Sequence, residues 1–197
     1  MRIVHEPMYS FVILTFVLIL IDTLLAWLSV KLAPAGASGV SWIFIAVAFM
    51  ILFTLWFGAY DAIAAYVGTL AGAGFFVSDQ LILHPEVAII WAIAGLLQVL
   101  IPLVAFRNFN VNLSLGNRRD WTFFLLFGVL INNIVGAAWG TLTLNFGNIM
   151  KTGDVAGIFS TWCIGNCIMT ILIIPLSLRY LTPKIRKSKL FVKYYWE

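Results

Sequence analysis

Six side chains between residues 91 and 166 are of the types that recognise a small organic molecule. They are three tryptophans and three residues with a hydroxyl or an amide: Trp91, Trp139, Trp162, Thr143, Asn145 and Asn166. Indole rings offer flat apolar faces, and amides and hydroxyls orient the polar groups of a ligand. Trp162 and Asn166 are four residues apart and share one face of a helix. The pattern predicts a solute-binding site; the alternative is an interfacial tryptophan belt with asparagines that bridge helices.

Other polar residues interrupt strongly apolar stretches. Asp22 lies within VLILIDTLLAWL, and Asn132 and Asn133 lie within LLFGVLINNIVGAAW. Polar groups within a membrane are costly, so they are candidates for function. Asp22 is interpreted either as a proton-coupling group or as a hydrogen-bonded carboxyl that packs helices. At least one of the two asparagines is expected to face the interior, and Asp61 is expected at the start of a helix.

The sequence holds no pattern that predicts catalysis. It has no phosphate-binding loop of the form GxxxxGK[ST], no HExxH and no GxSxG. Its only cysteines, Cys163 and Cys167, have no further cysteine or histidine close by in the sequence, so we expect packing residues and no metal site. We therefore expect no enzyme and no cofactor.

The composition is that of a membrane protein. Of the 197 residues, 62% are hydrophobic and 10% are charged, whereas a soluble domain carries about 25% charged residues. The mean hydropathy is +1.02. Since a span needs about 20 apolar residues, the sequence predicts an all-α fold with six transmembrane helices: 10–31, 40–58, 59–78, 87–106, 121–146 and 157–181. Five spans result if 40–78 forms one bent helix.

The positive charges predict the orientation. With six spans, one side holds 10 of the 12 lysines and arginines: Arg2, Arg107, Arg118, Arg119, Arg179, Lys184, Arg186, Lys187, Lys189 and Lys193. Only Lys31 and Lys151 lie on the other side. Because positive loops stay in the cytoplasm, we expect a multi-pass protein of the cell membrane with both termini inside. Residues 1–182 form one membrane domain, and 183–197 form a basic, aromatic cytoplasmic tail that contacts lipid or a partner. Nucleic acid is not an expected partner.

Small residues recur at every fourth position of the predicted third span, at Ala64, Gly68 and Gly72. Such a face lets another helix approach closely. It serves either packing within the bundle or docking of a separate membrane subunit.

Three segments resemble the substrate-binding S-components of energy-coupling-factor (ECF) transporters. They are FGAYDAIAAYVGTLAGAG (57–74), GLLQVLIPLVAF (95–106) and GNCIMTILIIPL (165–176). The resemblance implies a six-helix protein that captures a small organic solute, such as a vitamin, from outside. It also implies a transmembrane coupling subunit and ATPases as partners. The first predicted helix lacks the alanine-spaced docking face usual in that family.

The last predicted span, with WCIGN and LIIPLSL, is also similar to the final helix of MASE-type membrane sensor regions. This similarity implies a ligand-sensing membrane domain that acts through a signalling partner. A structural or regulatory subunit of a larger membrane complex is a further alternative.

Overall fold

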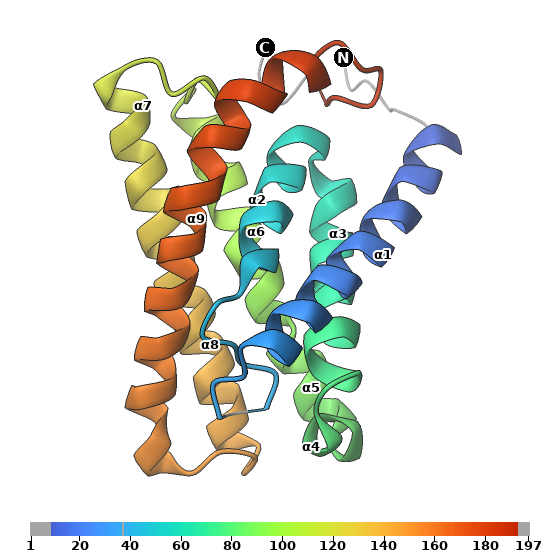
Figure 1. The fold of residues 1–197 in the computed structure, drawn as a ribbon, viewed down its shortest axis with the longest axis vertical. Helices are drawn as coiled ribbons and strands as arrows, with labels where there is room; N and C mark the ends of the chain where they lie inside the picture. Colours follow the sequence, from blue (N-terminus) through green and yellow to red (C-terminus); the bar gives the residue numbers. More distant parts are fainter. Residues whose placement is uncertain (1–8, 37, 193–197) are drawn as a thin grey trace.

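The computed structural model describes residues 9–36 and 38–192, and its regular elements there are helices (Figure 1). Their bounds are α1 Tyr9–Leu32, α2 Ile45–Phe57, α3 Ala59–Gly68, η1 Thr69–Phe75, α4 Asp79–Leu83, α5 Pro85–Trp91, α6 Ile93–Asn108, α7 Arg118–Phe123, η2 Phe124–Ile131, α8 Asn132–Phe146, η3 Thr152–Asp154 and α9 Val155–Ile185. Here η1 and η2 are π-helical turns that continue α3 and α7, and η3 is a short 3₁₀ turn. The predicted all-helical fold class is confirmed for this part of the chain.

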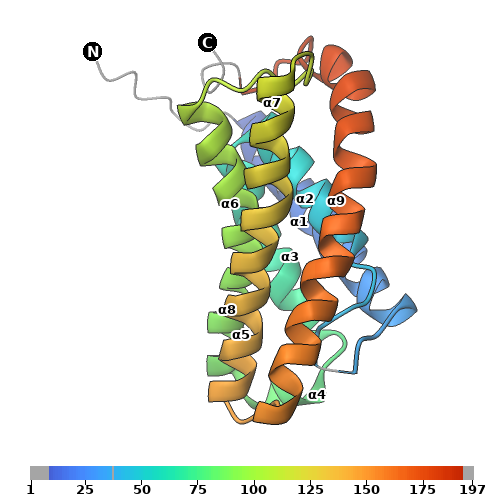
Figure 2. The ribbon, with the colours of Figure 1, turned by 90° about the vertical axis from the view of Figure 1, so that its left-hand side faces the viewer.

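Four continuous helical stretches are long and apolar enough to cross a membrane: Tyr9–Leu32, Pro85–Asn108, Arg118–Phe146 and Thr152–Ile185. The second stretch consists of α5 and α6, and the third consists of α7, η2 and α8. Helix α8 packs beside α6 and α9 (Figure 2). The structure is therefore compatible with a helical membrane protein. Helix α2 is apolar but has 13 residues, which makes it about 20 Å long, short of the hydrocarbon core of about 30 Å.

Gly58 separates α2 from α3. Its φ of +66° lies in the region that favours glycine, and Gly58 serves as the C-cap of α2 and the N-cap of α3. The segment 40–78 is therefore two helices and not one bent helix.

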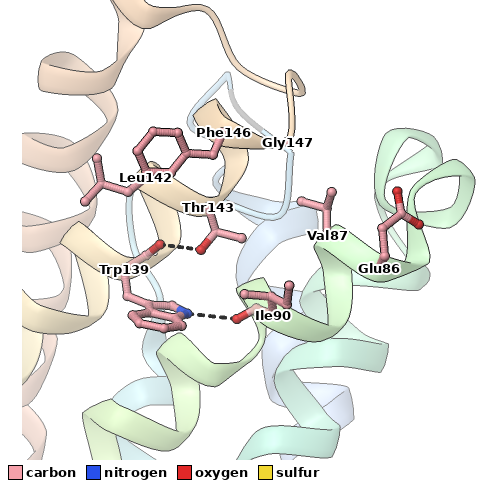
Figure 3. Close-up of a pocket in the computed structure, with 8 residues that line it drawn as sticks. All are labelled: Glu86, Val87, Ile90, Trp139, Leu142, Thr143, Phe146 and Gly147. Atoms are coloured by element: carbon pink, nitrogen blue, oxygen red, sulfur yellow. Dashed lines mark hydrogen bonds between the residues drawn. The ribbon is translucent and has the colours of Figure 1, made fainter.

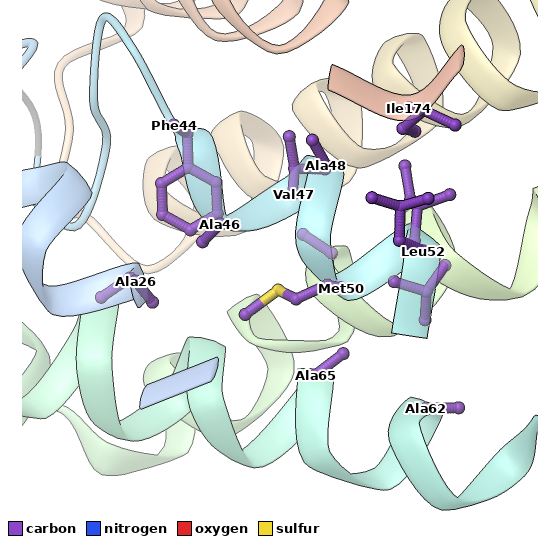
Figure 4. Packing of buried hydrophobic residues seen from close by; sticks show 14 of the residues in the cluster. Ala26, Phe44, Ala46, Val47, Ala48, Met50, Leu52, Ala62, Ala65 and Ile174 are labelled. Atoms are coloured by element: carbon purple, nitrogen blue, oxygen red, sulfur yellow. The ribbon is translucent and has the colours of Figure 1, made fainter. Parts of the chain in front are cut away.

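Helix α2 lies at the centre of the bundle, where nine of its 13 residues are buried. It packs against α9, α6, α1 and α3. Met50 and Leu52 point from α2 into a cluster with Ala65 of α3 and Ile174 of α9 (Figure 4). The apolar core is thus built around one short helix.

Helix α1 is attached differently. It crosses the bundle obliquely (Figure 1), and only five of its 24 residues are buried. Its main neighbours are α3 and η1. Gly68 and Gly72 make this contact close, because a Cβ on Gly68 would lie 2.6 Å from Asp22 Cβ and one on Gly72 would meet the Thr23 carbonyl oxygen. In the structure, these two residues of the small-residue face pack against the chain's own first helix.

The predicted tail begins inside α9, which ends at Ile185. The chain then folds back over the end of α2, where the Val192 amide donates to the Trp56 carbonyl oxygen at 3.0 Å. Trp56 Nε1 also donates to Thr182 Oγ1 at 3.0 Å. The part of the tail from 193 to 197, with Lys193, and the predicted cytoplasmic Arg2 lie outside the described residues.

The close α1–η1 contact generates a stability prediction. Gly72→Ala places a methyl group against the Thr23 carbonyl oxygen, and such overpacking costs about 1–3 kcal/mol. We expect a lower thermal midpoint in detergent. Gly157→Ala in α9 is the matched control, because nothing lies within 4 Å of its new Cβ. Equal midpoints for the two variants would contradict the packing described here.

Candidate solute-binding site

Trp91 and Trp162 come together in the interior of the bundle. Trp91 ends α5, Trp162 lies in α9, and their ring centroids are 6.1 Å apart with an interplanar angle of 56°. Trp91 is 1% exposed and Trp162 is 6% exposed. Gly140 of α8 makes room for the Trp162 ring, because a Cβ there would collide with it. Two of the three predicted tryptophans thus form one aromatic wall.

These two rings line a small closed cavity. Its other lining residues come from the loop before α2, from η1 and from α6: Gly39, Val40, Ser41, Phe44, Thr69, Ala73 and Gln98. The cavity volume is about 10 Å³, which is room for about one water molecule. No lysine, arginine, histidine, aspartate or glutamate lines it. The cavity is therefore neutral and aromatic.

Several polar atoms in or near the cavity have no hydrogen-bond partner. Trp91 Nε1 and Thr69 Oγ1 belong to the lining, and both are buried and unpaired. Asn166, one helical turn beyond Trp162, is 0% exposed and neither of its side-chain amide atoms is bonded. A buried polar group without a partner costs about 1–3 kcal/mol. Trp91 Nε1 and Thr69 Oγ1 are therefore the unpaired hydrogen-bonding atoms of the cavity lining, whereas the predicted site residue Asn166 is not among the lining residues.

Residues 38–44, which precede α2, cover the cavity, and we call them the roof segment. Gly39, with φ +73°, packs against Trp91, and a Cβ there would lie 2.7 Å from Trp91 Cη2. Ser41 Oγ donates to the carbonyl oxygens of Ser29 at 2.8 Å and Ala33 at 2.9 Å. The Trp42 carbonyl oxygen touches Gly165 of α9. The roof segment is thus held to the end of α1 and to α9.

Gln98 of α6 links the cavity to an amide network. Its Nε2 donates to Asn133 Oδ1 at 2.9 Å, and its carbonyl oxygen accepts from Asn132 Nδ2 at 3.3 Å. Asn133 Nδ2 donates to the Val129 carbonyl oxygen at 2.7 Å and contacts Thr170 Oγ1 of α9 at 3.4 Å. Both asparagines are 0% exposed and face the interior. The sequence analysis missed Gln98, although it is the one polar residue of GLLQVLIPLVAF.

Trp139 and Thr143 lie elsewhere, in an open groove between α5 and α8 (Figure 3). The groove volume is about 490 Å³. Trp139 Nε1 donates to the Ile90 carbonyl oxygen and Thr143 Oγ1 to the Trp139 carbonyl oxygen, each at 2.8 Å. Both donors are therefore already in use. Glu86 is the only charged residue among the groove's lining residues.

Asn145 has a local role. Its Nδ2 donates to the Met150 carbonyl oxygen at 3.0 Å and to Thr152 Oγ1 at 3.1 Å, so it closes the turn between α8 and α9. Of the six predicted site residues, Trp91 and Trp162 line the cavity and Trp139 and Thr143 line the groove. Asn145 and Asn166 line neither of them. The cavity lining that was predicted to come from Trp139, Thr143 and Asn145 comes instead from Thr69, Gln98 and the roof segment.

Asp22 has a partner that the sequence analysis did not assign. Asp61 stands in the first turn of α3, as expected, but its carboxyl makes no helix cap and is 0% exposed. Its Oδ2 accepts a 2.7 Å hydrogen bond from Thr54 Oγ1 of α2. The carboxyl of Asp22, also 0% exposed, is its charged neighbour, and neither oxygen of Asp22 has a hydrogen-bond partner. The signal was present in the sequence, since Asp61 shares a helical face with Gly68, seven residues on.

Comparison with family models, with curated proteins and with solved structures finds no match to this chain. The cavity and the open groove are thus the two features from which a function can be inferred.

The amide network generates a second stability prediction. Gln98→Leu removes the donor to Asn133 Oδ1 and leaves a buried amide unpaired, which costs about 1–3 kcal/mol. We expect a lower thermal midpoint than in the parent. The same change at Gln80, which is exposed in α4, should leave the midpoint near the parent value. A Gln98→Leu variant as stable as Gln80→Leu would show that the network does not hold α6 and α8 together.

Proposed function

We propose that this chain is a membrane solute-binding protein that holds a small neutral organic molecule between Trp91 and Trp162, beneath the roof segment. The observation that carries the proposal is the combination of two aromatic rings with unpaired, buried Trp91 Nε1 and Thr69 Oγ1 in one cavity. Aromatic walls with few convergent polar groups are typical of small-molecule sites.

The proposed topology has six spans. Four are the long helices, the fifth is the α3–η1 stretch, and the sixth is α2 together with the non-helical residues from 40 to 44 before it, because α2 alone is too short. The basic residues described at the ends of α6 and α9 and at the start of α7 gather at the end of the molecule where α2 meets α3 (Figure 1). The positive-inside rule places this end in the cytoplasm. The roof segment, α4 and the turn between α8 and α9 lie toward the other end (Figure 1). The roof segment that covers the cavity then faces the outside of the cell membrane.

The lining selects the class of solute. With no ionisable side chain among the lining residues, a charged solute would lose its hydration without compensation. A flat, uncharged ring fits the indole faces, and an acceptor on the ring satisfies Trp91 Nε1. Because the present volume of about 10 Å³ is too small for such a molecule, the roof segment must move outward to admit it.

The chain contains no ATP-binding loop, so release of the solute into the cell needs a partner. The resemblance to ECF S-components supports a transmembrane coupling subunit with ATPases. In this proposal α1 offers an exposed apolar surface to lipid, with Ile13, Phe16 and Leu20 each more than half exposed.

A structural or regulatory subunit is the second candidate. The closed state of the cavity favours it, since a space for about one water also suits a polar core that binds no solute. A sensor that signals through a partner also needs this cavity to bind a ligand. The ligand-retention experiment below therefore tests the sensor and the transport functions together.

The test is native mass spectrometry of the protein extracted gently from the membrane. Trp91→Phe keeps an aromatic ring but removes the unpaired N–H. Loss of one good hydrogen bond weakens binding about tenfold, so we expect the variant to retain much less of the small molecule than the parent. Trp139→Phe, the same change in the open groove, is the matched control and should retain the molecule. Equal retention in all three proteins, or no retained molecule in any, would contradict the proposed site.

A further inference from the structure

The open groove between α5 and α8 is apolar, carries one carboxylate and adjoins a hollow with one lysine. We propose that the groove holds one phospholipid with an ammonium headgroup. Its acyl chain lies against Trp139 and Leu142, its ammonium group lies at Glu86, and its phosphate lies at Lys151. The proposal goes beyond the solute cavity and does not depend on it.

The groove lies at the end of two helices and is about as deep as one lipid leaflet. Helix α5 begins at Pro85 and α8 ends at Phe146. From Phe146 the lining extends along α8 to Trp139, a rise of about 10 Å, and one leaflet contributes about 15 Å of hydrocarbon. A partner helix that crosses the whole membrane would extend over about 30 Å, so an acyl chain matches the groove better.

The walls of the groove suit an acyl chain. Leu142 and Phe146 of α8 lie across the groove from Ile90 of α5 (Figure 3), and all three side chains are exposed. The Trp139 N–H and the Thr143 hydroxyl already donate to backbone carbonyl oxygens. Neither donor is therefore left for a polar solute, and an apolar chain loses nothing by covering them.

Glu86 attracts a cation to the groove. It is the only ionisable residue among the lining residues, and its side chain is 68% exposed at the start of α5. Its ion-pair contact in the described part of the chain is with His84, whose Nδ1 lies 3.4 Å from Glu86 Oε1. A neutral imidazole leaves the charge of the carboxylate uncompensated. An ammonium group beside the carboxylate compensates it.

The hollow next to the groove carries the opposite charge. Phe146 lines both the groove and this hollow, which lies on the turn between α8 and α9 and has a volume of about 550 Å³. Lys151 is exposed there and forms no ion pair with the residues that the structure describes. A lysine ammonium is a common partner of phosphate groups. The two charges near Phe146 therefore match the phosphate and the ammonium of a zwitterionic headgroup.

The combination selects one class of ligand. Phosphatidylglycerol has the chain and the phosphate but brings no positive group to Glu86. A soluble amine has the positive group but leaves the apolar walls and Lys151 without a partner. A phospholipid such as phosphatidylethanolamine has the chain, the phosphate and the ammonium group.

The experiment is native mass spectrometry of the protein from nanodiscs that contain equal amounts of phosphatidylethanolamine and phosphatidylglycerol with the same acyl chains. The measurement is made at about pH 8, above the usual range in which an imidazole is charged. We expect the parent to retain one lipid per chain and to favour phosphatidylethanolamine about threefold, which is the effect of one exposed ion pair. Equal retention of the two lipids, or no retained lipid, would overturn the proposal.

Two charge variants test the headgroup. Glu86→Gln should abolish the preference for phosphatidylethanolamine and leave one lipid bound. Asp79→Asn is its matched control, because Asp79 is exposed on α4 and lines neither hollow. Lys151→Gln should lower the retention of both lipids about threefold, whereas Lys31→Gln at the end of α1 should not. A charge variant that behaves as its control would contradict the assigned headgroup contacts.

A third variant tests the groove itself. Thr143→Trp places an indole ring in the groove and should displace both lipids. Retention equal to that of the parent would show that the lipid binds elsewhere and would overturn the proposal. In protein extracted from its native membrane, a soluble amine or a protein subunit that Thr143→Trp displaces in place of a lipid would also overturn it.

The solute cavity is tested separately. Trp91→Phe leaves the groove unchanged and should retain the lipid as the parent does. Lipid retention that is lost in Thr143→Trp and kept in Trp91→Phe supports the groove whatever the solute experiment shows.

Discussion

The contact between α1 and the glycine face of α3 and η1 is the constraint on which the rest of the structure depends. Gly68 and Gly72 let the two backbones touch, and this contact places Asp22 beside Asp61. It also fixes the end of α1, from which the roof segment is held by Ser29. Small residues are a common means of close helix approach in membranes, where apolar surface alone gives helices little reason to associate.

Polar groups in the bundle fall into two kinds. Gln98 and Asn133 bond to each other and to neighbouring groups, so they tie α6 to α8. Trp91 Nε1 and Thr69 Oγ1, by contrast, are buried without partners in the adjoining cavity. Most buried polar groups in proteins are satisfied, and those that are not call for an explanation. In the function proposed above, a solute that enters beneath the roof segment would supply the missing partner.

The sequence allowed much of the fold to be predicted. Apolar length identified the long helices, and the predicted boundary between the spans 40–58 and 59–78 falls at the break between α2 and α3. The length of α2 was not predictable in the same way, because hydropathy continues through Trp42 and Ile43 into the roof segment, where the backbone is no longer helical. The count of six spans stays a prediction for this reason.

The site was harder to predict. A sequence indicates the depth of a residue in the membrane more reliably than the side of the helix on which its side chain lies. Trp91 and Trp162 were placed together correctly by type and depth. Trp139 was placed at the same depth, but its ring lies in the open groove and its N–H bonds Ile90. Thr69 and Gln98 are single polar residues in apolar stretches, and only tertiary packing shows that they line the same cavity.

The central claim is that the space between Trp91 and Trp162 is a solute site. The most direct measurement is an experimental structure of the protein extracted together with its native lipids. We expect non-protein density beneath a displaced roof segment, within hydrogen-bonding distance of Trp91 Nε1 and Thr69 Oγ1. A closed roof over a cavity that holds only water would contradict it.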